Sequence, residues 1–95
     1  MALFLMKVTF TEDVEKRLSV RPIHREFLKN LLDTGRLYAA GPFADDKGGF
    51  SIYDVADLAE AEATLAQDPF TINGVFASTE INEWIPVFSR TPVDA

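Results

Sequence analysis

Apolar and polar side chains alternate near the N-terminus, and this alternation predicts a β-strand over Leu3–Phe10. One face of this strand would carry four apolar side chains: Phe4, Met6, Val8 and Phe10. The other face begins with Leu3 and Leu5 and ends in polar residues. Because helices would cover only one face of a small sheet, the second apolar face needs another cover, and a partner subunit is the simplest one.

A helical pattern follows this strand and extends to Thr34, directly before Gly35. Thr11, which precedes two acidic residues, is expected to cap its N-terminus. Pro22 interrupts the pattern, and a proline inside a continuous helix costs about 3 kcal/mol or more. The sequence therefore predicts two helical segments, with a break between Ser19 and Pro22 and with Pro22 in the first turn of the second segment.

Two short strands, Leu37–Phe43 and Phe50–Val55, flank a turn-forming cluster at 45–49 and predict a hairpin. Asp57 and Glu60 then have the spacing of a capping box at the start of a second helix. Pro69 ends that helix by Asp68, because the residue before a proline avoids the α conformation. Three segments complete the chain: a single turn at Pro69–Asn73 closed by Gly74, a last strand at Val75–Phe88, and a polar tail at 90–95.

The predicted order β-α-β-β-α-β is that of the split βαβ or ferredoxin-like fold, an α+β class with an antiparallel sheet and helices on one face. With 95 residues, the chain is expected to form one domain, 1–95. Its formal charge of −6 lacks the basic footprint of nucleic-acid binding and disfavours anionic membranes. Because the apolar run at 2–6 is too short for a signal peptide or a membrane span, we expect a cytoplasmic protein.

His24 is the only histidine, and there is no cysteine. At helical spacing His24 shares an arc with Phe27, Leu28 and Leu31, so its side chain should face the sheet. Two interpretations stay open: a core imidazole bonded to a backbone carbonyl, or a general acid–base. A metal site is disfavoured, because one histidine without cysteines leaves only carboxylates as further ligands.

Asp68 also has two interpretations. Asp-Pro is typical of a helix N-cap followed by proline at the first helical position. Alternatively, Asp68 reaches His24 and holds its tautomer, which would make a general acid–base pair.

Other positions could shape a binding site around this pair. Gly41 and Pro42 either end a strand or let a ligand approach the backbone closely. Arg17 and Arg21 precede His24 in helical register, and either lie in solvent or place positive charge near an anionic substrate. Four aromatic residues are candidate pocket walls: Phe43, Tyr53, Phe70 and Phe76.

The chain resembles the YCII-like family in three segments whose order and spacing are fairly specific. They are EKRLSVRPIH at 15–24, AGPF at 40–43, and QDPF at 67–70 together with GVF at 74–76. The resemblance implies a ferredoxin-like fold that dimerises through its sheets, as in dimeric α/β-barrel proteins. It also implies a His–Asp active site, which falls on His24 and Asp68. A characterised relative is a cofactor-free dehydrochlorinase of a chlorinated hydroxyhydroquinone.

Together these observations predict a small cofactor-independent homodimeric enzyme that moves a proton on a phenolic or enolisable substrate, in lyase or isomerase chemistry. We expect His24 and Asp68 to be catalytic, without a metal. The expected substrate contacts are Arg21, Gly41, Pro42, Phe43, Phe70 and Phe76.

Two other functions stay open. One is a non-catalytic dimeric module that binds a small ligand or another protein, which a His24 buried against a backbone carbonyl with no adjoining cavity would favour. The other, a cofactor-free monooxygenase, rests on fold analogy alone.

Overall fold

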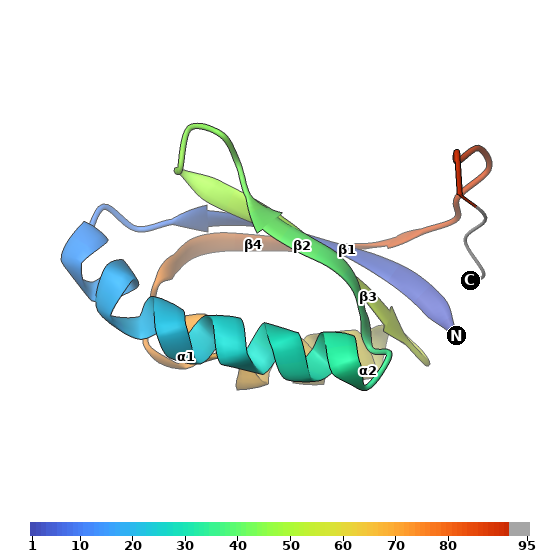
Figure 1. Cartoon of the computed structure of the whole chain (residues 1–95), viewed down its shortest axis with the longest axis horizontal. Helices are drawn as coiled ribbons and strands as arrows, with labels where there is room; N and C mark the ends of the chain where they lie inside the picture. The colour runs from blue at the N-terminus through green and yellow to red at the C-terminus, as the bar shows by residue number, and fades with distance from the viewer. Residues whose placement is uncertain (92–95) are drawn as a thin grey trace.

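The computed structural model describes residues 1–91, with four strands in one sheet and three helices packed on one face of it (Figure 1). The strand order is β2-β3-β1-β4, and all neighbouring strands are antiparallel. The predicted ferredoxin-like α+β fold is therefore confirmed; part of the polar tail, 92–95, lies outside the described residues. The elements are β1 (Ala2–Phe10), α1 (Val14–Asp33), β2 (Leu37–Pro42), β3 (Gly48–Val55), α2 (Leu58–Gln67), α3 (Pro69–Ile72) and β4 (Phe76–Trp84).

Strand β1 lies inside the sheet, between β3 and β4, and its alternation sets the core. Phe4 lies opposite Tyr53 of β3, and Met6 lies opposite Ile81 of β4. The side chains on this face are buried under the helices, as their two-residue spacing predicts. The buried core consists of Phe4, Met6, Leu31, Leu37, Tyr53, Val55, Ala61 and Leu65.

Helix α1 differs from its prediction in two ways. It continues through Pro22 without a break, and its N-cap is Asp13, not Thr11. The Asp13 carboxylate accepts a hydrogen bond of 3.0 Å from the backbone N–H of Lys16. Figure 1 shows the first turns of α1 at an angle to the rest, and a bend of this kind is how a helix accommodates an internal proline. Contacts that Arg17 and His24 make with other elements hold both sides of the bend.

The last strand and the hairpin also differ from prediction at their ends. Strand β4 stops at Trp84, four residues before the predicted end, since Pro86 has no N–H to donate to a ladder. Strand β3 begins at Gly48, so the two glycines belong to the strand and not to the turn. The backbone at Gly48 passes so close to β1 that a Cβ there would overlap the carbonyl oxygen of Val8.

Replacing Pro22 with alanine should raise the free energy of unfolding by about 1–3 kcal/mol. Alanine supplies the missing N–H for the carbonyl of Leu18 and removes the ring that crowds it. Urea unfolding measures the change, and Glu26→Ala on the exposed side of the same helix is the control, expected within about 0.5 kcal/mol of wild type. A less stable Pro22→Ala protein would show that the bend is itself needed for packing.

The close approach at Gly48 gives a second prediction. Gly48→Ala should lower the free energy of unfolding by about 1–3 kcal/mol, because backbone atoms of β1 must shift. Gly41→Ala is the matched control in the neighbouring strand, since nothing lies within 4 Å of a Cβ there. Equal stabilities of the two variants in urea unfolding would contradict the prediction.

Candidate active site

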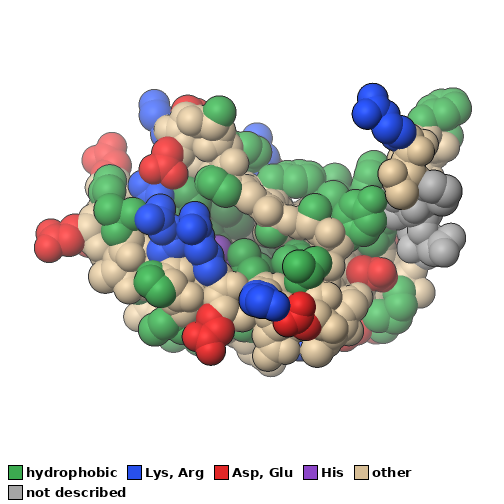
Figure 2. Space-filling view, in the orientation of Figure 1, with side chains coloured by type: hydrophobic (Ala, Val, Ile, Leu, Met, Phe, Trp, Pro, Cys, Tyr) green, Lys and Arg blue, Asp and Glu red, His purple; other side chains and the backbone are tan. Residues whose placement is uncertain are grey.

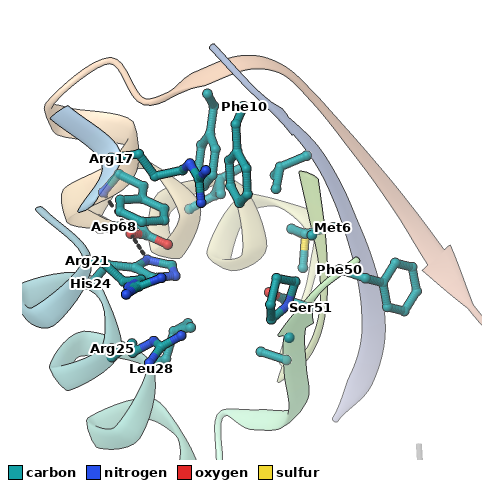
Figure 3. A pocket seen from close by; sticks show the side chains of 18 of the residues that line it. Met6, Phe10, Arg17, Arg21, His24, Arg25, Leu28, Phe50, Ser51 and Asp68 are labelled. Atoms are coloured by element: carbon teal, nitrogen blue, oxygen red, sulfur yellow. Dashed lines mark hydrogen bonds and ion pairs between the residues drawn. The ribbon is translucent and has the colours of Figure 1, made fainter. Parts of the chain in front are cut away.

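His24 and Asp68 lie side by side, although 44 positions separate them in the sequence. His24 is on α1, and Asp68 joins α2 to α3. Nδ1 of His24 is 2.7 Å from Oδ1 of Asp68, and Figure 3 shows the two side chains facing each other. The His24 side chain is 15% exposed and that of Asp68 only 4%. The carboxylate is therefore almost removed from water and depends on protein partners.

Asp68 makes both of the contacts that its sequence interpretations called for, one to His24 and one at the N-terminus of α3. Its Oδ1 also accepts a hydrogen bond of 2.9 Å from the backbone N–H of Phe70, which makes it the N-cap of α3. Its own N–H donates to the carbonyl of Leu65 at the end of α2. The backbone of α3 thus fixes the direction in which the carboxylate presents its oxygen to His24.

Phe70 fixes the plane of the imidazole. Its ring is stacked on that of His24, with centroids 3.7 Å apart and planes 4° apart. The rings of Phe10 and Phe76 lie nearly perpendicular to that of Phe70, at centroid distances of 5.9 and 5.7 Å. With a carboxylate acceptor at Nδ1, the neutral ring carries its proton on Nδ1 and leaves Nε2 with a lone pair. No group of residues 1–91 hydrogen-bonds to Nε2.

A cavity of about 380 Å³ adjoins this imidazole, within the usual range of small-molecule sites. In Figure 2 the histidine is visible within a recess, with Lys and Arg side chains gathered beside it. The arrangement that would favour the non-catalytic module, an imidazole bonded to a backbone carbonyl with no adjoining cavity, is not the one observed. Of the predicted pocket residues, Arg21, Gly41, Pro42, Tyr53, Phe70 and Phe76 line the cavity.

Phe43 is the exception among the predicted substrate contacts. It is not among the residues that line the cavity, and its ring is partly exposed. Its backbone N–H and carbonyl are used in the turn, where they bond to Gly48 and Asp46. The aromatic residue after Gly-Pro therefore takes part in the hairpin through its backbone, and the structure does not bring its ring into the cavity lining.

Several cavity residues were not identified from the sequence. Met6 and Phe10 face the cavity from β1, and the alternation that predicted their common face could have indicated this. Ser51 lies opposite Met6 on β3 and is a polar residue on the helix-covered face. Arg25 follows Arg21 by one helical turn. Phe50 also contributes, but Figure 3 shows its ring pointing away from the cavity.

Arg17 ties the hairpin turn to α1. Its guanidinium forms two hydrogen bonds, of 3.1 and 3.0 Å, with the two carboxylate oxygens of Asp46, a bidentate pair. It also lies over the ring of Phe10, 4.8 Å from the centroid. The Arg17 side chain is only 6% exposed, and the carboxylate of Asp46 compensates its charge. Asp46 itself has a positive φ of 61°, which a short polar side chain tolerates.

Tyr53 adds a neutral hydroxyl to the lining. Burial raises the pKa of this hydroxyl above its ordinary value of 10.0, and the negative charge of Asp68 raises the pKa further. The phenol therefore stays protonated at neutral pH and can donate a hydrogen bond into the cavity.

Within residues 1–91 no three His, Asp or Glu side chains are grouped so that they could hold a metal ion. No helix in the same part of the chain has the length and apolar character needed to cross a membrane.

Solved structures with the same architecture include two enzymes. One is 5-chloro-2-hydroxyhydroquinone dehydrochlorinase from Burkholderia phenoliruptrix AC1100 in complex with 2,5-dihydroxybenzoquinone. It has a TM-score of 0.77 and 26% identity, with 87% of this chain and 93% of that chain covered. The other is muconolactone isomerase, with a TM-score of 0.73, 21% identity and 97% of both chains covered. The second likeness is one of fold alone.

Sequence relatives identify the family. Protein YciI of Escherichia coli O6:H1 (strain CFT073) is 37% identical over 87 residues, which cover 81% of this chain and 89% of that protein. The YCII-related domain matches residues 2–85. This span includes all four strands, all three helices and both members of the His24–Asp68 pair. The chain belongs to the YCII-related domain family.

Proposed function

We propose that the protein is a small enzyme of lyase or isomerase type that needs no cofactor, with His24 as general acid–base and Asp68 as its positioning partner. The observation that carries the proposal is the Nδ1–Oδ1 hydrogen bond beside the cavity. It orients the imidazole and leaves Nε2 as the proton acceptor.

The proposed chemistry is a proton transfer between the substrate and His24. Nε2 takes a proton from a C–H or O–H group of the substrate, and the electron pair of that bond moves into the substrate. The ionised Asp68 stabilises the imidazolium that forms. In an isomerisation the imidazolium returns the proton to another substrate atom. In an elimination a leaving group departs with the electron pair, and the proton is released afterwards.

The lining of the cavity supports a small, flat, oxygenated substrate. Phe10, Phe70 and Phe76 supply aromatic surface, while Ser51 and Tyr53 supply hydroxyl groups. The dehydrochlorinase with 26% identity was solved with 2,5-dihydroxybenzoquinone, a single oxygenated ring. A cavity of about 380 Å³ accommodates a molecule of that size. We therefore propose phenolic or enolisable compounds as the substrate class.

Replacing Asp68 with asparagine should leave the fold intact, because asparagine caps a helix about as well as aspartate. It should redistribute the proton between the two ring nitrogens of His24, which ¹⁵N NMR of the imidazole measures. With a panel of substituted hydroquinones and unsaturated lactones in D₂O, it should slow any deuterium incorporation or turnover roughly 10²- to 10⁴-fold.

Asp57→Asn is the matched control, since it changes the same group at the N-cap of α2, outside the cavity lining. It should leave both the ring nitrogens and the rate at wild-type values. Identical imidazole spectra for wild type and Asp68→Asn, or equal rates, would remove Asp68 from the mechanism and leave it as a cap alone.

We also propose that two copies associate through the sheet face that carries no helices. Leu5, Ile52 and Trp84 lie in neighbouring strands on this face and stay partly exposed, and Phe50 joins them. Burying an apolar patch of this kind is favourable in proportion to its area. We thus propose two partners, a second copy of this chain and a small-molecule substrate. A cytoplasmic location stays a prediction from the sequence.

Sedimentation of the wild-type protein at micromolar concentration should give about twice the chain mass. Ile52→Glu should shift it to the mass of one chain, because a charge would be buried without a partner. Ile23→Glu, the same change at an isoleucine of α1 that is 60% exposed, should leave the mass at two chains. A wild-type protein that sediments as one chain refutes the dimer.

A further inference from the structure

Building on the proposed function, we propose that the substrate is an acid, ionised at neutral pH, whose anionic group binds between Arg21 and Arg25 at the mouth of the cavity. The proposal deepens the function in one respect: it names the charge of the substrate and the residues that select it.

Three arginines are evenly spaced on α1. Arg17, Arg21 and Arg25 follow one another at intervals of four residues, so they form one stripe along the helix. All three line the cavity. Figure 3 shows them on the same side as His24, which lies between Arg21 and Arg25 in the sequence.

Only one of these three positive charges is compensated by a carboxylate. Arg17 is held by Asp46 in a bidentate pair. Arg21 and Arg25 form no ion pair with any of residues 1–91. The two carboxylates in the lining are already engaged, Asp46 with Arg17 and Asp68 with His24 and the N-cap of α3. Two like charges one turn apart repel each other, and an anion between them relieves that repulsion.

The positive charge of Arg21 and Arg25 contrasts with the charge of the chain as a whole. The chain has a formal charge of −6, so a pair of uncompensated arginines beside the cavity is a local exception. A charged recess with apolar walls focuses its potential on a small ion of opposite sign. Arginine is suited to this role, since its planar donors can bind both oxygens of a carboxylate.

The geometry also positions the rest of the substrate. His24 lies between Arg21 and Arg25 along the helix, and the rise per residue is about 1.5 Å, so an anion held by both arginines lies close to the level of His24 along the axis of α1. Leu28 provides apolar lining from α1 near this point, and the hydroxyl of Tyr53 offers a neutral donor from the sheet.

The test compares two probes of equal shape, sodium benzoate and benzamide, in NMR titrations of the full-length protein. Wild type should bind benzoate saturably and more tightly than benzamide. Arg21→Gln and Arg25→Gln should each weaken benzoate binding roughly tenfold, since each loses a charge-assisted hydrogen bond. Neither variant should change the affinity for benzamide.

Lys29→Gln is the matched control, because it removes one positive charge from the same helix at an exposed residue that does not line the cavity. It should leave both affinities unchanged. The proposal is overturned if wild type shows no saturable benzoate binding, if benzamide binds equally well, or if Lys29→Gln weakens benzoate binding as much as the two arginine variants.

These measurements involve no proton transfer, so they separate the two proposals. Loss of charge discrimination in the arginine variants, with no deuterium exchange on any compound, would support anion binding and refute the acid–base function. Exchange that depends on Asp68, with benzoate and benzamide bound alike, would support the function and refute an anionic substrate.

Discussion

A single buried carboxylate oxygen connects the fold to the site. Oδ1 of Asp68 caps α3 through the N–H of Phe70 and holds Nδ1 of His24, at 2.9 and 2.7 Å. A carboxylate that is 4% exposed loses most of its hydration, and these two partners replace it. The cap also sets the start of α3, which places Phe70 against the imidazole. The same atom therefore fixes the start of α3. It also fixes the plane and the tautomer of the His24 imidazole.

The elements around this oxygen depend on it in turn. The turn after α3 closes at Gly74, whose φ of 67° favours glycine, and then leads into β4. Phe76, the first residue of β4, packs its ring nearly perpendicular to that of Phe70. A change at Asp68 thus reaches the aromatic wall of the cavity as well as the imidazole.

Local patterns predicted the order of the elements, although not the continuity of α1. Alternation in β1, the Asp57 cap and the Asp-Pro pair each act within a few residues, and the structure has the elements that they predict. Pro22 shows the limit of such patterns, since its cost in a helix is real. Contacts of Arg17 and His24 with distant elements nevertheless hold the helix together on both sides of it.

The candidate site shows the same limit. His24 and Asp68 could be named from the sequence, but their contact depends on the packing of α1 against α3. The Arg17–Asp46 pair joins residues 29 positions apart, and no local sequence pattern predicts it. The hairpin turn uses the backbone of Phe43, and its ring is not part of the cavity lining. Spacing alone does not show on which side of a turn a side chain lies.

The stacking of His24 on Phe70 has a stereochemical consequence. With the ring held parallel to Phe70 and Nδ1 engaged by Asp68, the imidazole cannot rotate to present its other nitrogen. In the proposed mechanism, one nitrogen fixed in one place both removes and returns the proton. A substrate that stays bound between these two events meets Nε2 from one side only. Any rearrangement carried out here would therefore be suprafacial, and a substrate proton would be retained in the product to the extent that the imidazolium is shielded from water.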